Sequence, residues 1–154
     1  MNSELVRSIA DLSNRWRNRF LPSKASSTPQ HLQRGAHGEK LACRFLRRKG
    51  YKILYRNFKG RSGGEIDIVC RNHDTLVFVE VKTRTREDFG RPITAVDREK
   101  KKRISRGGLN WLRMLDDPDI LFRFDVVEVI IAEDAGPRLE LIKNAFPLST
   151  PYIY

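Results

Sequence analysis

Two apolar, β-branched runs joined by a short polar turn leave the middle of this chain little freedom in how it folds. The runs cover residues 65–71 and 75–83, and Asn72, His73 and Asp74 between them have the composition of a tight turn. One face of the second run carries the valines at 77, 79 and 81, and the other carries Leu76, Phe78, Glu80 and Lys82. The pattern predicts a β-hairpin in a sheet that is covered on both faces.

Helical and strand patterns flank this hairpin. Helices are predicted over residues 35–50 and 96–115, and strands over residues 51–57, 122–131 and 138–143. Gly107 and Gly108 weaken the helical pattern of the second helix. A chain of 154 residues with 40% apolar content is long enough for one domain with a core. We therefore expect a single compact domain over residues 35–154.

The segment that precedes this domain, residues 1–34, has a different pattern. Apolar residues from Leu5 to Phe20 recur at helical spacing among arginines, which predicts a basic amphipathic helix. Residues 22–31 are rich in Ser, Pro, Lys and Gln, which is typical of a linker. Such a helix either packs on the domain or forms an arm that contacts nucleic acid or a membrane surface, and both interpretations stay open.

The charge balance favours a polyanionic partner. The net charge is +11, from 30 Lys and Arg against 19 Asp and Glu, and such a surface attracts polyanions. Cys43 and Cys70 are too few for a disulfide scaffold, and no window approaches the roughly 20 apolar residues of a membrane helix. The N-terminus also lacks the apolar stretch of a signal peptide. We expect a cytoplasmic protein with no transmembrane segment.

Three glycines and several basic residues lie between the first two predicted strands. Gly60, Gly63 and Gly64 predict a mobile, basic loop over residues 58–64. Their spacing does not match the phosphate-binding pattern Gly-x-x-x-x-Gly-Lys-Ser/Thr, which argues against nucleoside triphosphate binding.

The predicted hairpin brings two carboxylates together. With a two-residue turn at residues 73–74, Asp67 lies directly across from Glu80. Opposed carboxylates repel each other unless a cation or a proton lies between them. We therefore expect Mg²⁺ or Mn²⁺ to bind Asp67 and Glu80, with the Val81 carbonyl as a further ligand.

Lys82 is a candidate catalytic residue beside this carboxylate pair. It lies two residues after Glu80 on the same face, where its ammonium would position a water or neutralise charge in the transition state of phosphodiester hydrolysis. The same charged residues also suit a structural ion-pair cluster, and composition and spacing leave the two interpretations evenly balanced.

Two further charged residues border the apolar stripes of the predicted helices. Glu39 in the first helix and Lys100 in the second either reach this site or stay solvated at the helix edge. A basic wall for phosphate contacts is expected from Lys101, Lys102, Arg103 and Arg106, with Arg84, Arg86 and Arg91 from the preceding loop. Solvated helix charge is the alternative. The His and Cys residues form no pair with zinc-ligand spacing, and no nucleophile triad is apparent.

Several short motifs, taken in order, resemble a known family. They are Gly38-Glu39-Lys40-Leu41-Ala42, Gly50-Tyr51, Arg56-Asn57, Gly64-Glu65-Ile66-Asp67-Ile68-Val69, Phe78-Val79-Glu80-Val81-Lys82 and Ala95-Val96 followed by Lys100. Over about residues 35–131, the chain resembles the bacterial uncharacterised protein family 0102. Members of that family are described as predicted endonucleases related to archaeal Holliday junction resolvases, within the PD-(D/E)xK nuclease superfamily.

The resemblance implies a restriction-endonuclease-like α/β fold, in which helices flank a mixed central β-sheet of about five strands. It also implies catalytic roles for Asp67, Glu80 and Lys82, joined by Glu39 from the first helix and Lys100 from a later one. Ile66 stands where the superfamily name has Pro, a variation that leaves the carboxylate in place.

Three functional hypotheses follow. The first is a Mg²⁺-dependent endonuclease that hydrolyses DNA in preference to RNA, with branched, Holliday-junction-like DNA as a candidate substrate and a homodimer as a candidate assembly. The second is a nucleic-acid-binding module that keeps the fold without cleavage. The third is a basic adaptor that docks on an acidic protein or a membrane surface. The intact set of Asp67, Glu80 and Lys82 favours the first over the second.

Overall fold

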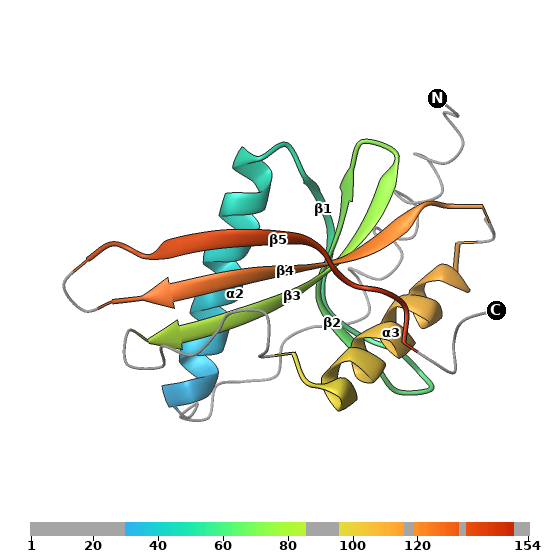
Figure 1. Cartoon of the computed structure of the whole chain (residues 1–154), viewed down its shortest axis with the longest axis horizontal. Helices are drawn as coiled ribbons and strands as arrows, with labels where there is room; N and C mark the ends of the chain where they lie inside the picture. The colour runs from blue at the N-terminus through green and yellow to red at the C-terminus, as the bar shows by residue number, and fades with distance from the viewer. Residues whose placement is uncertain (1–29, 86–95, 116–118, 133–134, 150–154) are drawn as a thin grey trace, which may run out of the picture.

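A computed structural model describes residues 30–85, 96–115, 119–132 and 135–149. In these residues a five-stranded mixed sheet lies between two helices, which is an α/β fold (Figure 1). The elements are α2 (Gln30–Arg48), β1 (Lys52–Lys59), β2 (Glu65–Asn72), β3 (Thr75–Thr85), α3 (Arg98–Leu112), β4 (Phe122–Ile131) and β5 (Arg138–Phe146). The predicted fold class and the predicted order of these elements are confirmed.

Several element boundaries differ from the sequence-based expectation, and α3 is shorter than expected, at Arg98–Leu112. Helix α2 begins at Gln30, inside the expected linker, and runs through Gly35 and Gly38. Gly38 is buried against Thr83, and a side chain at this position would clash with the threonine. Strand β5 continues past Lys143 as far as Phe146. The helix expected near the N-terminus lies outside the described residues.

The strand order is β1-β2-β3-β4-β5. Strands β3 and β4 are parallel, and the other neighbouring pairs are antiparallel. Parallel neighbours require a long crossover connection, and α3 lies within the connection between β3 and β4. This crossover brings α3 back onto the sheet beside the first residues of β2.

The two faces of the sheet have separate apolar cores, as the alternation in β3 predicted. One core joins Leu76 and Phe78 of β3 to Ile104 and Trp111 of α3. The other joins Val77 and Val79 to Ala42 and Leu46 of α2. The helices therefore cover opposite faces of the sheet.

Gly107 and Gly108 let α3 approach the sheet closely. Both glycines are buried, and a Cβ at Gly108 would lie 3.1 Å from the rings of both Phe78 and Phe124. Glycine lowers the stability of an isolated helix, but in α3 the absence of a side chain permits the close packing. The close approach sets the height at which Lys100 and Arg103 stand above β2 and β3.

The glycine loop after β1 is hydrogen-bonded to α3 and packs against it, contacts that the sequence did not predict. Asn110 Nδ2 donates to the Gly63 carbonyl at 2.9 Å, and Ser62 Oγ donates to Asn110 Oδ1 at 2.7 Å. Gly64 has a φ of +86° and lies against the backbone of Gly107. Hydrogen bonds and close backbone packing therefore fix this loop to α3.

Candidate active site

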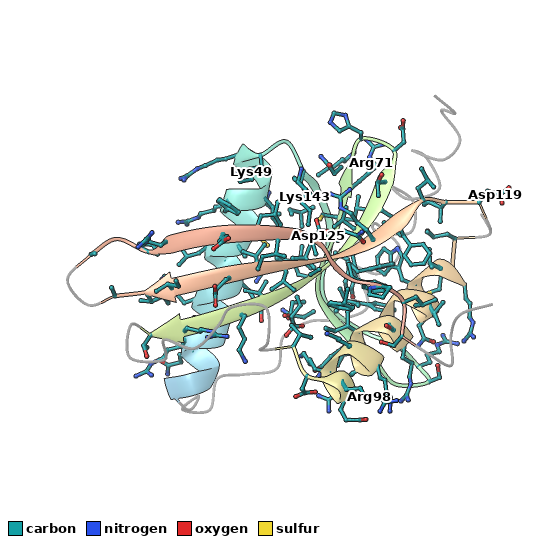
Figure 2. The ribbon with its side chains drawn as sticks, in the orientation of Figure 1. Lys49, Arg71, Arg98, Asp119, Asp125 and Lys143 are labelled. Atoms are coloured by element: carbon teal, nitrogen blue, oxygen red, sulfur yellow. The ribbon has the colours of Figure 1, made fainter. Side chains whose placement is uncertain are left out.

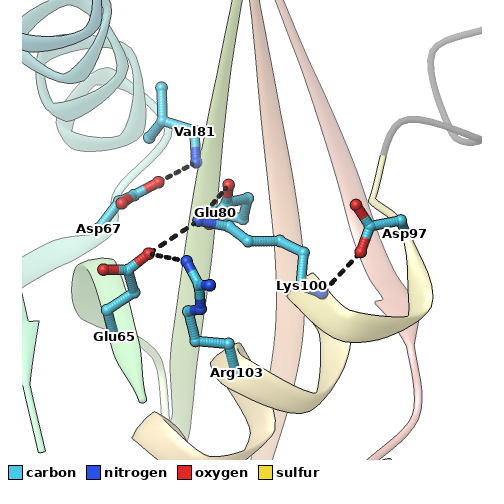
Figure 3. A network of polar contacts seen from close by, with 7 residues as sticks. All are labelled: Glu65, Asp67, Glu80, Val81, Asp97, Lys100 and Arg103. Carbon is cyan, nitrogen blue, oxygen red and sulfur yellow. Dashed lines mark hydrogen bonds and ion pairs between the residues drawn. The ribbon is translucent and has the colours of Figure 1, made fainter. Parts of the chain in front are cut away.

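The β2–β3 hairpin has the register that a two-residue turn predicts. Asn72 pairs with Thr75, and Ile68 pairs with Val79, so Asp67 and Glu80 are the next positions in register. The regular pairing ends at Ile68 and Val79. Beyond it, the Val81 N–H donates to Asp67 Oδ2 at 2.8 Å (Figure 3). The strands thus separate at the two carboxylates, and Asp67 occupies the opening.

Glu80 is buried beside Asp67 with only part of its bonding capacity used. Its side chain is 8% exposed, and its Oε1 lies 3.2 Å from the Lys100 ammonium. Within the described part of the chain, Glu80 Oε2 has no hydrogen-bond partner. Burial and the neighbouring Asp67 carboxylate raise the pKa of Glu80 to about 8, although Lys100 opposes the shift. In the absence of a bound cation, this carboxyl therefore holds a proton at neutral pH.

Helix α3 supplies two cations to the site. Asp97 caps the helix by accepting from the Lys100 N–H at 2.7 Å, which places Lys100 in the first turn. Glu65 Oε1 lies 3.3 Å from Lys100 Nζ and 3.2 Å from Arg103 Nη1 (Figure 3). The Lys100 side chain thus lies between two carboxylates, those of Glu65 and Glu80.

The charges in this cluster shift one another's pKa values. Burial raises the pKa of Glu65, but the hydrogen bond from Arg103 and the charge of Lys100 outweigh it, and the net pKa is lowered. Burial lowers the pKa of Lys100, but the carboxylates of Glu80, Asp67 and Glu65 outweigh it, and the net pKa is raised. Glu65 and Lys100 are therefore both ionised at neutral pH. The sequence pattern did not predict these contacts of Glu65, because strand alternation says nothing about contacts with α3.

Lys82 follows Glu80 on β3 and pairs in the parallel ladder with Glu128 of β4. Among the described residues it forms no ion pair with the carboxylates of the site. Arg84 does not contribute to an exposed wall: its side chain is 12% exposed and its Nε lies 3.0 Å from Glu128 Oε1. This buried pair lies on the same face of the sheet as Glu80.

The other expected site residues are placed differently. Glu39 Oε2 lies 3.6 Å from Arg56 Nη2, so the structure pairs it with β1 and not with Asp67 or Glu80. Lys102 pairs with Glu99 at 2.8 Å, and the Lys101 ammonium lies over the Phe146 ring. Arg103 is the most exposed of the site cations, at 59%. Arg86 and Arg91 lie outside the described residues.

Asp125 is a buried carboxylate of the same sheet whose contacts are structural, and it serves as a comparison for Glu80. It is fully buried near the middle of the strands (Figure 2). It accepts from Arg123 Nε at 3.0 Å and from the Asn144 N–H at 2.9 Å, and Arg123 in turn donates to the Tyr51 hydroxyl. Glu80 differs because it faces a second carboxylate and retains an unpaired oxygen.

The donor set at Asp67 and Glu80 fits a hard divalent cation that keeps water ligands. No group of three or more His, Cys, Asp or Glu side chains in the described ranges is arranged to hold a metal ion. Mg²⁺ commonly binds one or two carboxylates and takes its remaining ligands from water and phosphate. The unpaired Glu80 Oε2 beside Asp67 is the kind of buried oxygen that such a cation satisfies.

A sequence model of the uncharacterised protein family UPF0102 matches residues 38–129. The chain belongs to this family. A UPF0102 protein of Geobacter sulfurreducens is 47% identical over 115 residues, which cover 75% of this chain and 89% of that protein. A UPF0102 protein of Nocardia farcinica is 46% identical over 112 residues, which cover 73% and 87%. The UPF0102 match includes all the described site residues. Among the described helices, none is long and apolar enough to span a membrane.

Proposed function

We propose that this UPF0102 chain is an endonuclease that uses Mg²⁺ or Mn²⁺ to hydrolyse phosphodiester bonds in DNA. The observation that carries the proposal is the Asp67–Glu80 pair at the point where β2 and β3 separate, with one buried Glu80 oxygen unpaired. Two adjacent ionised carboxylates in a low-dielectric site are unfavourable unless a cation or a proton lies between them. Lys82, Lys100 and Arg103 lie near this pair, and such basic residues attract the phosphates of a nucleic acid to the bound metal.

The chain's own residues have distinct parts in this proposal. Asp67 and Glu80 would bind the metal, and the Val81 carbonyl is a third candidate ligand, because the N–H and C=O of one strand residue point to the same side. When bound, Mg²⁺ supplies Lewis-acid stabilisation of the charge that develops on the phosphoryl oxygens. Lys82 would donate to the attacked phosphate or to the water beside it. Lys100 would balance the charge of Glu80.

One observation favours a second candidate, a nucleic-acid-binding module without cleavage. Lys100 already lies 3.2 Å from Glu80 and 3.3 Å from Glu65, so an internal cation partly neutralises the site without metal. A stable ion-pair cluster of this kind needs no catalytic role. The basic adaptor hypothesis depends on the N-terminal segment, which lies outside the described residues.

Cleavage assays separate the two candidates. Labelled duplex, single-stranded and four-way-junction DNA are incubated with the wild type, Asp67→Asn, Glu80→Gln and the control Glu99→Gln in Mg²⁺, Mn²⁺ or EDTA. Glu99 is an exposed carboxylate of α3 outside the Asp67–Glu80 pair, so its replacement controls for the lost charge. We expect metal-dependent cutting by the wild type and the control, and a loss of at least about a hundredfold in both site variants.

The same assay addresses the substrate and the assembly. Preferential cutting of the junction in a symmetric pattern would support branched DNA and a homodimer, while cutting of all duplexes would support a general endonuclease. No cutting by the wild type in either metal, together with retained DNA binding, would reject the nuclease proposal in favour of the binding module. A cytoplasmic location is part of the same proposal.

A further inference from the structure

Two cations of α3 converge on a single oxygen beside the proposed metal site. Glu65 Oε1 is 3.3 Å from Lys100 Nζ and 3.2 Å from Arg103 Nη1. Dashed lines mark both contacts in Figure 3. Lys100 is also within 3.2 Å of Glu80, so the shared acceptor lies next to the Asp67–Glu80 pair. An anionic oxygen that receives an ammonium and a guanidinium donor occupies the position that a phosphate oxygen would take.

The Glu65 contacts are suited to exchange. The Glu65 side chain is 36% exposed and that of Arg103 is 59% exposed. Ion pairs at such exposure are weak, because solvent screens them and long side chains lose freedom in forming them. A phosphodiester brings a full negative charge and two free oxygens to the same donors. The ligand can therefore replace the carboxylate without leaving either cation unpaired.

We propose that Lys100 and Arg103 form a phosphate subsite and that the Glu65 carboxylate occupies it until a phosphodiester of the nucleic acid backbone displaces it. The inference rests on the proposed function for the identity of the polyanion. It assigns Glu65 a role distinct from that of Asp67 and Glu80: it competes with the ligand for two cations and binds no metal in this scheme. Removing its charge should free both cations and strengthen binding.

The test measures binding without metal. The anisotropy of a fluorescent 20-base-pair duplex is followed in EDTA at fixed low salt for the wild type, Glu65→Gln, Arg103→Gln, the double variant and the control Glu99→Gln. Glu99 is a matched control because it is also an α3-side carboxylate paired with a basic residue, 2.8 Å from Lys102, but it is 80% exposed and lies outside the subsite. Melting temperatures check that each variant is folded.

We expect Glu65→Gln to bind the duplex about five- to tenfold more tightly than the wild type, and Glu99→Gln to differ by less than about twofold. In the Arg103→Gln background, the gain from Glu65→Gln should fall to about twofold or less, because one of the two donors is missing. The proposal is overturned if Glu65→Gln binds no more tightly than Glu99→Gln, if the gain survives in the double variant, or if no variant binds. Because the assay contains EDTA, a protein that shows the expected binding but cuts no DNA keeps the subsite and loses the nuclease function.

Discussion

At the scale of single residues, the two buried carboxylates Glu80 and Asp125 have opposite bonding. Asp125 accepts three hydrogen bonds from Arg123 and Asn144, so its negative charge is satisfied inside the protein. Glu80 instead faces Asp67, and one of its buried oxygens receives no donor from the described residues. The ionised form of Glu80 is therefore costly in the metal-free protein.

This cost predicts a pH-dependent effect of Glu80→Gln. The pKa of Glu80 is about 8 in the folded protein, above its ordinary value of 4.5. A group with a raised folded pKa contributes stability below its unfolded pKa, and that contribution is lost as pH rises through the folded pKa. In EDTA, the stability of Glu80→Gln relative to the wild type should therefore increase between about pH 4.5 and pH 8, by at most about 1.4 kcal/mol per pH unit, and then level off.

Urea unfolding of both proteins at pH 5, 6, 7, 8 and 9 measures this difference. The exposed Glu99→Gln variant should show no comparable trend over the same range. A difference between Glu80→Gln and the wild type that stays constant with pH would contradict the raised pKa.

The sequence allowed the Asp67–Glu80 pair to be predicted, because strand alternation and a two-residue turn determine the register. It did not allow the partners of longer side chains to be predicted. Glu39 turns to Arg56, Arg84 to Glu128, and Glu65 to α3. Those contacts depend on rotamers and on how closely each helix packs against the sheet, and neither is encoded in a periodic pattern.

At the scale of elements, the junction between the glycine loop and α3 positions the cations of the site. Gly64 lies against the backbone of Gly107, one turn of α3 beyond Arg103. Glycines in a sequence indicate either conformational freedom or close contact, and only the packed structure distinguishes the two. For this reason the loop was expected to be mobile and α3 to be weakened, whereas the glycines in fact allow close packing.

Gly64→Ala should consequently be much more damaging than Gly63→Ala. Both residues have positive φ values, +86° and +87°, so both variants incur backbone strain of about 1 kcal/mol. A Cβ at Gly63 meets only the Arg106 side chain, at 3.4 Å, whereas a Cβ at Gly64 runs into the backbone of Arg106 and Gly107. We expect a loss of about 3 kcal/mol or more for Gly64→Ala.

Thermal or urea unfolding of the two variants, compared with the wild type, measures the contrast. The Gly63→Ala protein is the matched control, since it has the same backbone requirement without the overlap. Equal losses in the two variants would show that positive φ, and not the contact with α3, determines the need for glycine at position 64.

At the scale of the whole molecule, the two covered faces of the sheet differ in what they offer a polyanion. The face of α3 carries the proposed site, and α3 contains six Lys and Arg with a single acidic residue, Glu99. Helix α2, on the other face, also has exposed basic residues, including Arg44 and Arg48. The only acidic residue of α2 is Glu39, which pairs with Arg56 of β1. The net charge of +11 attracts DNA to either face, so charge alone does not determine the binding surface.

The salt dependence of DNA binding distinguishes the faces. If the duplex lies over α3, Arg98→Gln with Lys101→Gln removes two phosphate contacts, and the slope of log K against log salt should become less steep by about 2. Arg98 lies at the exposed start of that helix (Figure 2). Arg44→Gln with Arg48→Gln removes the same charge from α2 and should weaken binding slightly without a comparable change in slope, because counterions are released only where phosphates are contacted. Anisotropy titrations in EDTA at several salt concentrations provide both slopes.

Equal changes in slope for the two double variants would mean that DNA is held by the overall charge of the protein. A larger change for the α2 variant would place the binding surface on the face opposite Asp67 and Glu80.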